Sequence, residues 1–246
     1  MLLTSKVVLL TGARRMGPVI AERMIAKGAT LVVTYRGART DADLVVAAAR
    51  DRGALAIALE ADVSDPASVD ALMAAIDVRC GRLDVVVNMA SIYESVAFEA
   101  LTEADWHRQL GVDLHGTFRV CRAAVPLMRR GGGGRIINFT DWVVASGRPR
   151  YEGYLAYYVA KAGVKALTEA LALELARDGI LVNAIAPGPI LPPPHTTDAE
   201  HEAVADATPL GRWGGADEIA KVIDALIDSD FITGETIRVD GGRHVR

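Results

Sequence analysis

The chain has only two cysteines, Cys80 and Cys121, among 246 residues. Two thiols cannot form a disulfide framework or a thiolate metal site, and so few of them suit a reducing compartment. The histidines include His107, His195 and His201, which lie in polar segments without a partner at the spacing of metal ligands. We therefore expect no metal site, and we interpret both cysteines as core or helix-packing residues.

Charge of either sign is not in excess. The net charge is −4 and the pI is about 5.8, with basic and acidic residues interspersed. No surface for nucleic acid or for an anionic membrane is therefore expected. The apolar stretch at residues 1–10 is short, is interrupted by Lys6 and has no basic segment before it. We interpret it as the first strand, which leaves a cytoplasmic protein with no membrane partner.

Hydrophobic residues make up 51% of the chain and fall into short apolar runs that alternate with helical patterns. No internal repeat or low-complexity tail interrupts this alternation. Strands are expected at residues 6–10, 30–35, 54–60, 83–88, 135–140, 180–186 and 235–239. Helices are expected at residues 19–27, 40–52, 66–79, 103–129 as one or two helices, 153–177 and 216–228.

Repeated strand–helix–strand units with apolar strands predict a parallel sheet with right-handed crossovers. We expect an α/β fold: a single Rossmann-type domain over residues 1–246, with a doubly wound parallel sheet of about seven strands and helices on both faces. A proline-rich and then acidic segment near residues 188–210 is interpreted as a lid over the substrate, with disorder as the alternative. Ligands of such sheets bind beyond the carboxyl ends of the strands.

The turn after the first strand carries Gly12 and Gly17, which allow close backbone approach, and the N–H groups of the following helix suit a pyrophosphate. Arg14 and Arg15 in this turn would repel each other without an anionic ligand. After the second strand, Arg36 stands where an NAD site would carry an acidic residue, and a guanidinium suits a 2′-phosphate. NADP is therefore predicted in preference to NAD. The alternatives are a plain strand-to-helix turn and, for Arg36, a solvated loop charge.

Later strand ends also carry candidate ligand groups. After the third strand, Asp62 could accept from an adenine amino group or cap the next helix. After the fourth strand comes a small, polar segment, and Tyr93 beyond it can stack on a flat ring. The group that follows strands four to six consists of Asn88, Ala90, Ser91, Tyr93, Asp141, Trp142, Pro187, Gly188 and Ile190.

Tyr157 and Lys161 lie four positions apart in a long helical pattern, so they share one face of the helix. A nearby ammonium stabilises a phenolate, which lets such a pair exchange a proton with a substrate near neutral pH. Alone, this spacing also fits two amphipathic residues on a solvated helix face. The candidate groups at the other strand ends favour the catalytic interpretation.

Several motifs together resemble the short-chain dehydrogenase/reductase family over essentially the whole chain. They are the T-G-x-x-x-x-G turn at 11–17, Asp62-Val63, Asn88-x-Ala90, Tyr157-x-x-x-Lys161, Pro187-Gly188 and Asp240-Gly241-Gly242. The resemblance implies hydride transfer from NADPH to a C=O or C=N, with proton donation through Tyr157. It also implies that Lys161 holds the nicotinamide ribose and lowers the pKa of the tyrosine.

Within this family, the paired arginines, the Tyr35-Arg36 strand end and Asp141 are similar to pteridine reductases and dihydromonapterin reductases. Most family members have a serine where Asp141 stands, and the likeness implies that Asp141 works with Tyr157 in protonating the substrate. A protonated carboxyl can donate to a pterin nitrogen, whereas an ionised one only accepts. A turn-capping role for Asp141 is the alternative. Tyr93 matches an aromatic residue that sandwiches the pterin against nicotinamide.

The resemblance implies three sets of site residues. The catalytic set is Asp141, Tyr157, Lys161 and Asp113. The cofactor set is Gly12, Arg14, Arg15, Met16, Gly17, Tyr35, Arg36, Asp62, Val63, Asn88, Ala90, Ser91, Lys161, Pro187, Gly188 and Ile190. The substrate set is Arg15, Ser91, Tyr93, Asp141, Trp142 and Tyr157. The chain departs from the family in a glycine turn that is one residue shorter and in Asp113, which replaces an asparagine of the proton relay but can still anchor a water.

The leading hypothesis is an NADPH-dependent reductase of a pterin-like or other small carbonyl substrate. One alternative is a general ketone or 3-oxoacyl thioester reductase, and Arg148 and Arg150 hint at the basic patch that an acyl carrier protein would need. A second alternative is a catalytically weak NADP-binding sensor, against which the intact Tyr157 and Lys161 argue. Family resemblance also suggests a homotetramer built on the long helices at 103–129 and 153–177 and on the last strand.

Overall fold

Seven parallel strands form one sheet in the computed structural model, which describes residues 1–246. Their order is β3-β2-β1-β4-β5-β6-β7, so the direction of winding reverses between β1 and β4. This is the doubly wound sheet expected from the sequence. The strands are β1 (Val7–Thr11), β2 (Thr30–Tyr35), β3 (Ala56–Glu60), β4 (Val85–Asn88), β5 (Gly134–Phe139), β6 (Ile180–Pro187) and β7 (Thr236–Val239).

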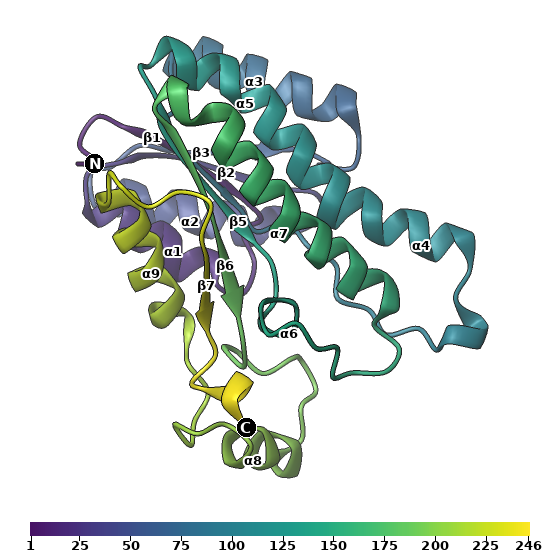
Figure 1. Cartoon of the computed structure of the whole chain (residues 1–246). Helices are drawn as coiled ribbons and strands as arrows, with labels where there is room; N and C mark the ends of the chain where they lie inside the picture. Colours follow the sequence, from purple (N-terminus) through teal and green to yellow (C-terminus); the bar gives the residue numbers. More distant parts are fainter.

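Helices cover both faces of this sheet (Figure 1). Buried side chains of α1, α2 and α9 pack on one face, and those of α3, α5 and α7 pack on the other. The central strands β1, β4 and β5 are buried at every residue, which explains their continuous apolar sequences. The helices are α1 (Gly17–Ala26), α2 (Arg39–Asp51), α3 (Pro66–Cys80), α4 (Glu103–Leu110), α5 (Thr117–Arg130), α6 (Trp142–Ala145), α7 (Leu155–Leu175), α8 (Asp198–Asp206) and α9 (Ala216–Asp228).

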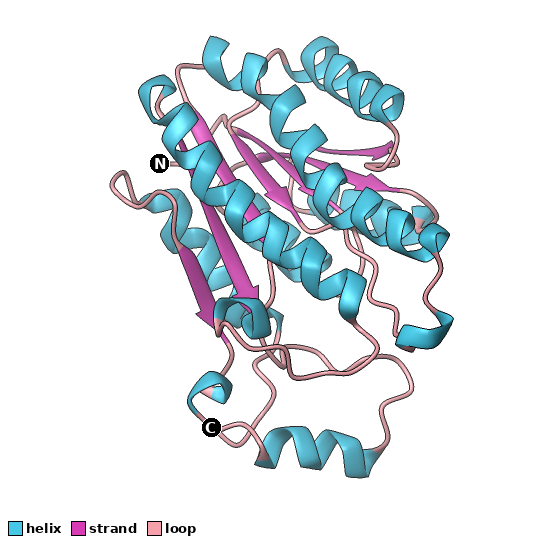
Figure 2. Cartoon of the chain, turned by 45° about the vertical axis from the view of Figure 1, so that its right-hand side comes forward, coloured by secondary structure: helices cyan, strands magenta, loops and turns pink.

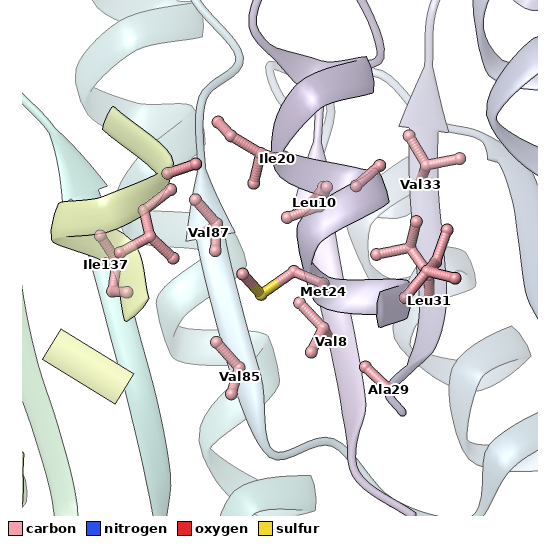
Figure 3. Packing of buried hydrophobic residues seen from close by; sticks show 14 of the residues in the cluster. Val8, Leu10, Ile20, Met24, Ala29, Leu31, Val33, Val85, Val87 and Ile137 are labelled. Carbon is pink, nitrogen blue, oxygen red and sulfur yellow. The ribbon is translucent and has the colours of Figure 1, made fainter. Parts of the chain in front are cut away.

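Helix α1 is fixed on the sheet by apolar side chains (Figure 3). Ile20 and Met24 belong to the same fully buried cluster as Leu10 of β1 and Val87 of β4. Burying each such side chain contributes roughly 1.5–3 kcal/mol. Because α1 follows β1 directly, this packing also fixes the turn between them at the carboxyl edge of the sheet.

A π-helical segment, Gly111–Gly116, joins α4 to α5 where the sequence predicts one or two helices. Such segments are rare and often occur at functional sites. Helix α7 crosses it closely, because a Cβ on Gly163 would come within 2.8 Å of the Leu114 side chain. The glycine therefore lets α7 approach the π-helical segment, and this approach brings Lys161 to Asp113.

Two helices were not expected from the sequence. Helix α6 is a single turn, and α8 lies away from the sheet beside the chain's carboxyl end (Figure 2). Helix α8 starts at a capping box formed by Thr197 and Glu200 and has no buried residue, so it gives no amphipathic signal. None of the helices is both long and apolar enough to span a bilayer.

Candidate active site

A tyrosine and an aspartate meet beyond the carboxyl end of β5. Tyr157, in the first turn of α7, donates a hydrogen bond from its hydroxyl to Oδ2 of Asp141 at 3.0 Å. Asp141 is the N-cap of α6, and its Oδ1 accepts from the backbone N–H of Val143 at 2.9 Å. The capping bond fixes the carboxylate, so the phenol has a partner in a defined position.

The pKa of Tyr157 is raised well above its ordinary value. Burial is the largest cause, and the negative charges of Asp141 and Asp113 add to it, because each disfavours the phenolate. The net direction is opposite to the lowered pKa of Tyr157 expected from the resemblance. A phenol with a raised pKa keeps its proton at neutral pH and can act as a proton donor.

Lys161, the positive charge near the phenol, forms a buried ion pair. Nζ of Lys161 lies 2.9 Å from Oδ1 of Asp113, and both side chains are buried. The same ammonium donates a hydrogen bond to the carbonyl of Phe139 at 3.0 Å. It lies 5.6 Å from the ring centroid of Tyr157. The lysine charge next to the phenol is thus compensated by Asp113.

Asp113 is fully buried and surrounded by donors. Its carboxylate accepts from the hydroxyl of Ser91, from the backbone N–H of Ile92 at 3.2 Å and from Nε2 of Gln109 at 2.7 Å, besides pairing with Lys161. A buried charge needs this degree of compensation. Where the sequence suggested an asparagine-like relay, Asp113 forms an ion pair that joins the π-helical segment to α7.

Burial also raises the pKa of Asp141. The hydrogen bonds from Val143 and Tyr157 and the charge of Lys161 oppose this increase without reversing it. The protonated form of Asp141 is therefore more accessible than that of an ordinary aspartate. When protonated, its carboxyl can donate a proton toward the tyrosine oxygen.

The turn after β1 has the open backbone that a phosphate site requires. Gly12 has φ +102°, and a Cβ on Gly17 would lie only 3.0 Å from the Gly12 carbonyl oxygen. The hydroxyl of Thr11 accepts from the backbone N–H groups of Met89 at 2.9 Å and Ala90 at 3.2 Å. The glycine turn and the loop after β4 are thereby held together at the point where the sheet reverses.

Two exposed arginines lie close to the carboxyl ends of β1 and β2. Nε of Arg14 is 3.6 Å from Oδ2 of Asp41, and Nη1 of Arg36 is 3.6 Å from Oδ2 of Asp62. Both arginine side chains are exposed. Burial would raise the pKa of Asp62, but hydrogen bonds from Ser64 and the charge of Arg36 lower it. Neither arginine is buried in an internal pair, so both guanidiniums can reach an anionic ligand.

The other residues expected to bind the cofactor differ in how deeply they are buried and in what they contact. Asn88 is buried and donates to Oδ1 of Asn138 at 2.9 Å, so its amide is bonded within the sheet. A Cβ on Gly188 would collide with Asp240, 2.6 Å from its Cα. Val63 and Ile190 are buried in the two cores. Met16, Tyr35, Ala90 and Pro187 are half-buried at the carboxyl edge of the sheet.

A cavity of about 620 Å³ opens beside Tyr157 and is lined by Asp141, Tyr93, Trp142 and residues of the 187–204 segment. Its size is that of a small-molecule site. Arg15, which has φ +58°, also lines this cavity and donates to the carbonyl of Leu191 at 2.7 Å. Arg15 therefore connects the glycine turn to the segment expected to form a lid.

Aromatic side chains line the cavity close to the tyrosine hydroxyl. The ring of Tyr93 stacks on Tyr154 at 4.6 Å and meets Tyr157 edge-on at 4.9 Å. Burial is the main reason why the pKa of Tyr93 is raised. Sequence reasoning missed Tyr154 and Tyr151, although both precede Tyr157 at intervals of three residues. It also missed Gln109 and Arg243, whose chain positions gave no signal of proximity to the site.

A glycine turn at the switch point of a doubly wound sheet, beside a phenol, carboxylate and ammonium, defines the class of nucleotide-dependent α/β oxidoreductases. A family model described as "Enoyl-(Acyl carrier protein) reductase" matches residues 12–244. The chain belongs to the short-chain dehydrogenase/reductase family.

Relatives with known names match over nearly the full length. A 3-oxoacyl-[acyl-carrier-protein] reductase from Synechocystis sp. is 37% identical, covering 98% of this chain and 97% of the relative. A gluconate 5-dehydrogenase from Burkholderia cenocepacia, solved in complex with NADP and tartrate, is 32% identical with a TM-score of 0.90, covering 99% and 97%. A short-chain dehydrogenase/reductase from Serratia marcescens is 28% identical with a TM-score of 0.91, covering 99% and 100%. These names agree with the alternative of a ketone or 3-oxoacyl reductase, while the pteridine reductase likeness stays a prediction.

Proposed function

We propose that the protein is an NADPH-dependent reductase of ketone carbonyl groups, with 3-oxoacyl thioesters as the first substrates to test. The observation that carries the proposal is the hydrogen bond of Tyr157 to Asp141 beside an aromatic cavity. Relatives named as 3-oxoacyl-[acyl-carrier-protein] reductases support the substrate class.

The residues present fit NADPH. The open turn at Gly12 and Gly17 would hold the pyrophosphate at the start of α1, and Arg36 with Arg14 would bind the 2′-phosphate. The Burkholderia relative, solved with NADP, supports this cofactor. When bound, NADPH supplies the hydride for reduction of the carbonyl.

Tyr157 is proposed to give its proton to the developing alkoxide of the substrate. Its raised pKa keeps the phenol protonated beforehand, and burial makes the phenolate left behind unfavourable. Asp141, which shares a hydrogen bond with the phenol and has a raised pKa, can return a proton to that oxygen. Lys161 and Asp113 act as a compensated pair that positions the lysine near the ring of Tyr157.

A second candidate function is reduction of a C=N bond in a pterin or a similar flat heterocycle. It is favoured by Asp141 itself, since a protonated carboxyl can donate to a ring nitrogen. The ring of Tyr93 beside Tyr154 and Tyr157 offers a flat apolar wall for such a ring system. The alternative of a catalytically weak NADP-binding sensor has no comparable support, because Tyr157, the proposed proton donor, is intact.

A substrate panel with purified protein tests the proposal. NADPH or NADH is mixed with a 3-oxoacyl thioester, a simple ketone or a dihydropterin, and the oxidation of the reduced dinucleotide is followed by absorbance. We expect reduction of a ketone carbonyl with NADPH. Reduction of the dihydropterin alone would establish the second function, and no oxidation with any substrate would refute both.

A homotetramer is proposed from exposed apolar side chains on the helices named above. Phe118 of α5 and Leu155 and Val159 of α7 are at least one third exposed, and Leu173 of α7 is 82% exposed. Such side chains on long adjacent helices suit an interface between copies of the chain. Sedimentation equilibrium tests this directly, and a monomer at micromolar concentration would refute it.

A further inference from the structure

A row of neighbouring aromatic rings joins Tyr157, the proposed proton donor, to Trp142. The ring centroids of Tyr157 and Tyr154, of Tyr154 and Tyr151, and of Tyr151 and Trp142 are each 6.3 Å apart. All except Tyr157 line the catalytic cavity. A substrate whose carbonyl lies at Tyr157 can therefore extend its remaining atoms along this row toward Trp142.

Two guanidinium groups lie over the indole ring at the far end of the row. Cζ of Arg150 is 5.2 Å from the ring centroid of Trp142, and Cζ of Arg243 is 5.6 Å from it. Each can interact favourably with the face of the ring. Two positive charges on one ring also repel each other, so an anion between them would stabilise the arrangement.

Neither arginine pairs with an aspartate or glutamate side chain. Arg243 donates to the carbonyl of Val204 at 3.0 Å and to the hydroxyl of Thr208 at 3.4 Å. Arg150 donates to a main-chain oxygen of Arg246 at 3.0 Å. The aspartate nearest in sequence, Asp240, is bound by His244 at 2.7 Å. By contrast, Arg108, Arg129 and Arg130 on the outer helices each pair with an acidic side chain.

The space around the guanidiniums is hollow and joins the catalytic cavity. A second cavity of about 510 Å³ is lined by Arg150, Arg243 and Arg246, with Asp206 as its one acidic residue. Trp142, Tyr151 and Arg243 line both cavities. One ligand can therefore contact the aromatic row and the arginines together.

We propose that Arg150 and Arg243, over the ring of Trp142, form a subsite for an anionic group on the substrate, a carboxylate or a phosphate remote from the carbonyl that is reduced. Guanidinium groups bind both anions through paired, charge-assisted hydrogen bonds. Arg243 is half-buried and held by α8, so it presents a fixed donor set, whereas the exposed Arg150 can close over the anion. This subsite rests on the proposed function and narrows its substrates.

Matched substrate pairs test the subsite. The carboxylate pair is 9-oxodecanoate, whose chain is long enough to separate the two groups, and its methyl ester; the phosphate pair is 3-oxobutanoyl-coenzyme A and the neutral N-acetylcysteamine thioester. We expect the anionic member of one pair to have a kcat/KM at least about tenfold higher, mainly through a lower KM, as expected for a charged hydrogen bond. The pair that shows the preference identifies carboxylate or phosphate.

Variants then locate the preference. In Arg150→Gln and Arg243→Gln the ratio of anionic to neutral kcat/KM should fall toward one, and Arg243→Lys should restore part of it. Arg79→Gln, at an exposed arginine of α3 outside both cavities, is the control and should keep the ratio. Equal reduction of both members of each pair by the wild-type protein overturns the subsite while leaving the proposed function intact.

A binding measurement covers the case in which no substrate of the panel is reduced. Calorimetric titration of the NADP-saturated protein with inorganic phosphate should show binding that the Arg150→Gln/Arg243→Gln double variant lacks. Binding of equal strength to both proteins, or to neither, overturns the subsite. Loss of turnover with retained phosphate binding would instead refute only the proposed function.

Discussion

Nζ of Lys161 and Oδ1 of Asp113 lie 2.9 Å apart, with both side chains buried. This ion pair joins α7 to the π-helical segment and compensates the positive charge nearest to Tyr157. The tyrosine is consequently surrounded by two carboxylates and one lysine, an arrangement that keeps the phenol protonated. Such an environment suits a reductase that gives a proton to its product.

Replacing Asp113 by Asn removes the countercharge of Lys161 and leaves a buried ammonium without a charged partner. The free energy of unfolding should fall by roughly 3–5 kcal/mol, as for other broken buried pairs. Urea denaturation measures this change. The matched control is Asp70→Asn, in which the carboxyl is exposed on α3. A fall of less than about 1 kcal/mol for Asp113→Asn would show that the pair is not a stabilising contact.

The same Asp113→Asn variant should change the pH dependence of reduction. With its charge uncompensated, Lys161 stabilises the phenolate, so the pKa of Tyr157 should fall from its raised position. Reduction requires the protonated phenol, and the alkaline limb of kcat/KM should therefore move to lower pH than in the wild-type protein. An unchanged or upward-shifted limb would contradict the assignment of Tyr157 as the titrating donor.

Asp141→Asn should make the stability depend less on pH. Because the pKa of Asp141 is raised in the folded protein, the carboxyl favours folding when protonated and loses that contribution as pH rises through the folded pKa. The variant should therefore gain stability relative to wild type above that pKa, and the difference should shrink at acidic pH. Thermal denaturation from pH 4 to 8 checks the sign; a variant less stable at pH 8 would show that Asp141 is stabilising when ionised.

Arg36→Ala should weaken NADPH more than NADH. A charged hydrogen bond to the 2′-phosphate is worth roughly 1.5–3 kcal/mol, so the Kd for NADPH should rise at least about tenfold while that for NADH changes little. Fluorescence titration gives both constants. Arg50→Ala, at the other end of α2, serves as the control. Equal weakening of both dinucleotides would place Arg36 away from the 2′-phosphate.

The sequence predicted the sheet and the helices that cover it, because apolar runs and helical periodicity are local signals. The spacing of Tyr157 and Lys161 was also local. The pairing of Lys161 with Asp113 has no local signal, because it depends on how closely α7 crosses the π-helical segment at Gly163. The net rise in the pKa of Tyr157, caused first by burial and then by Asp141 and Asp113, was not predicted for the same reason.

The parts of the site that the sequence missed are those built by long-range packing. Helix α8 buries no side chain, so its pattern carried no helical signal beyond the capping residues. Arg243 reaches Trp142 only because the end of the chain lies next to α6 and α8 (Figures 1 and 2). Tyr151 and Tyr154 were visible in the sequence, but only the fold aligns them with Trp142.

The central claim is that the hydroxyl of Tyr157 delivers the proton, and removing it is the most direct test. The measurement compares kcat for NADPH-dependent reduction of a 3-oxoacyl thioester in Tyr157→Phe and in Tyr158→Phe, whose hydroxyl makes no hydrogen bond in the structure, with NADPH binding followed alongside. Loss of a general acid should lower kcat by roughly 10²–10⁴-fold in Tyr157→Phe, with NADPH affinity retained and Tyr158→Phe near wild type. A Tyr157→Phe protein that binds NADPH and reduces the thioester at the wild-type rate would contradict the account.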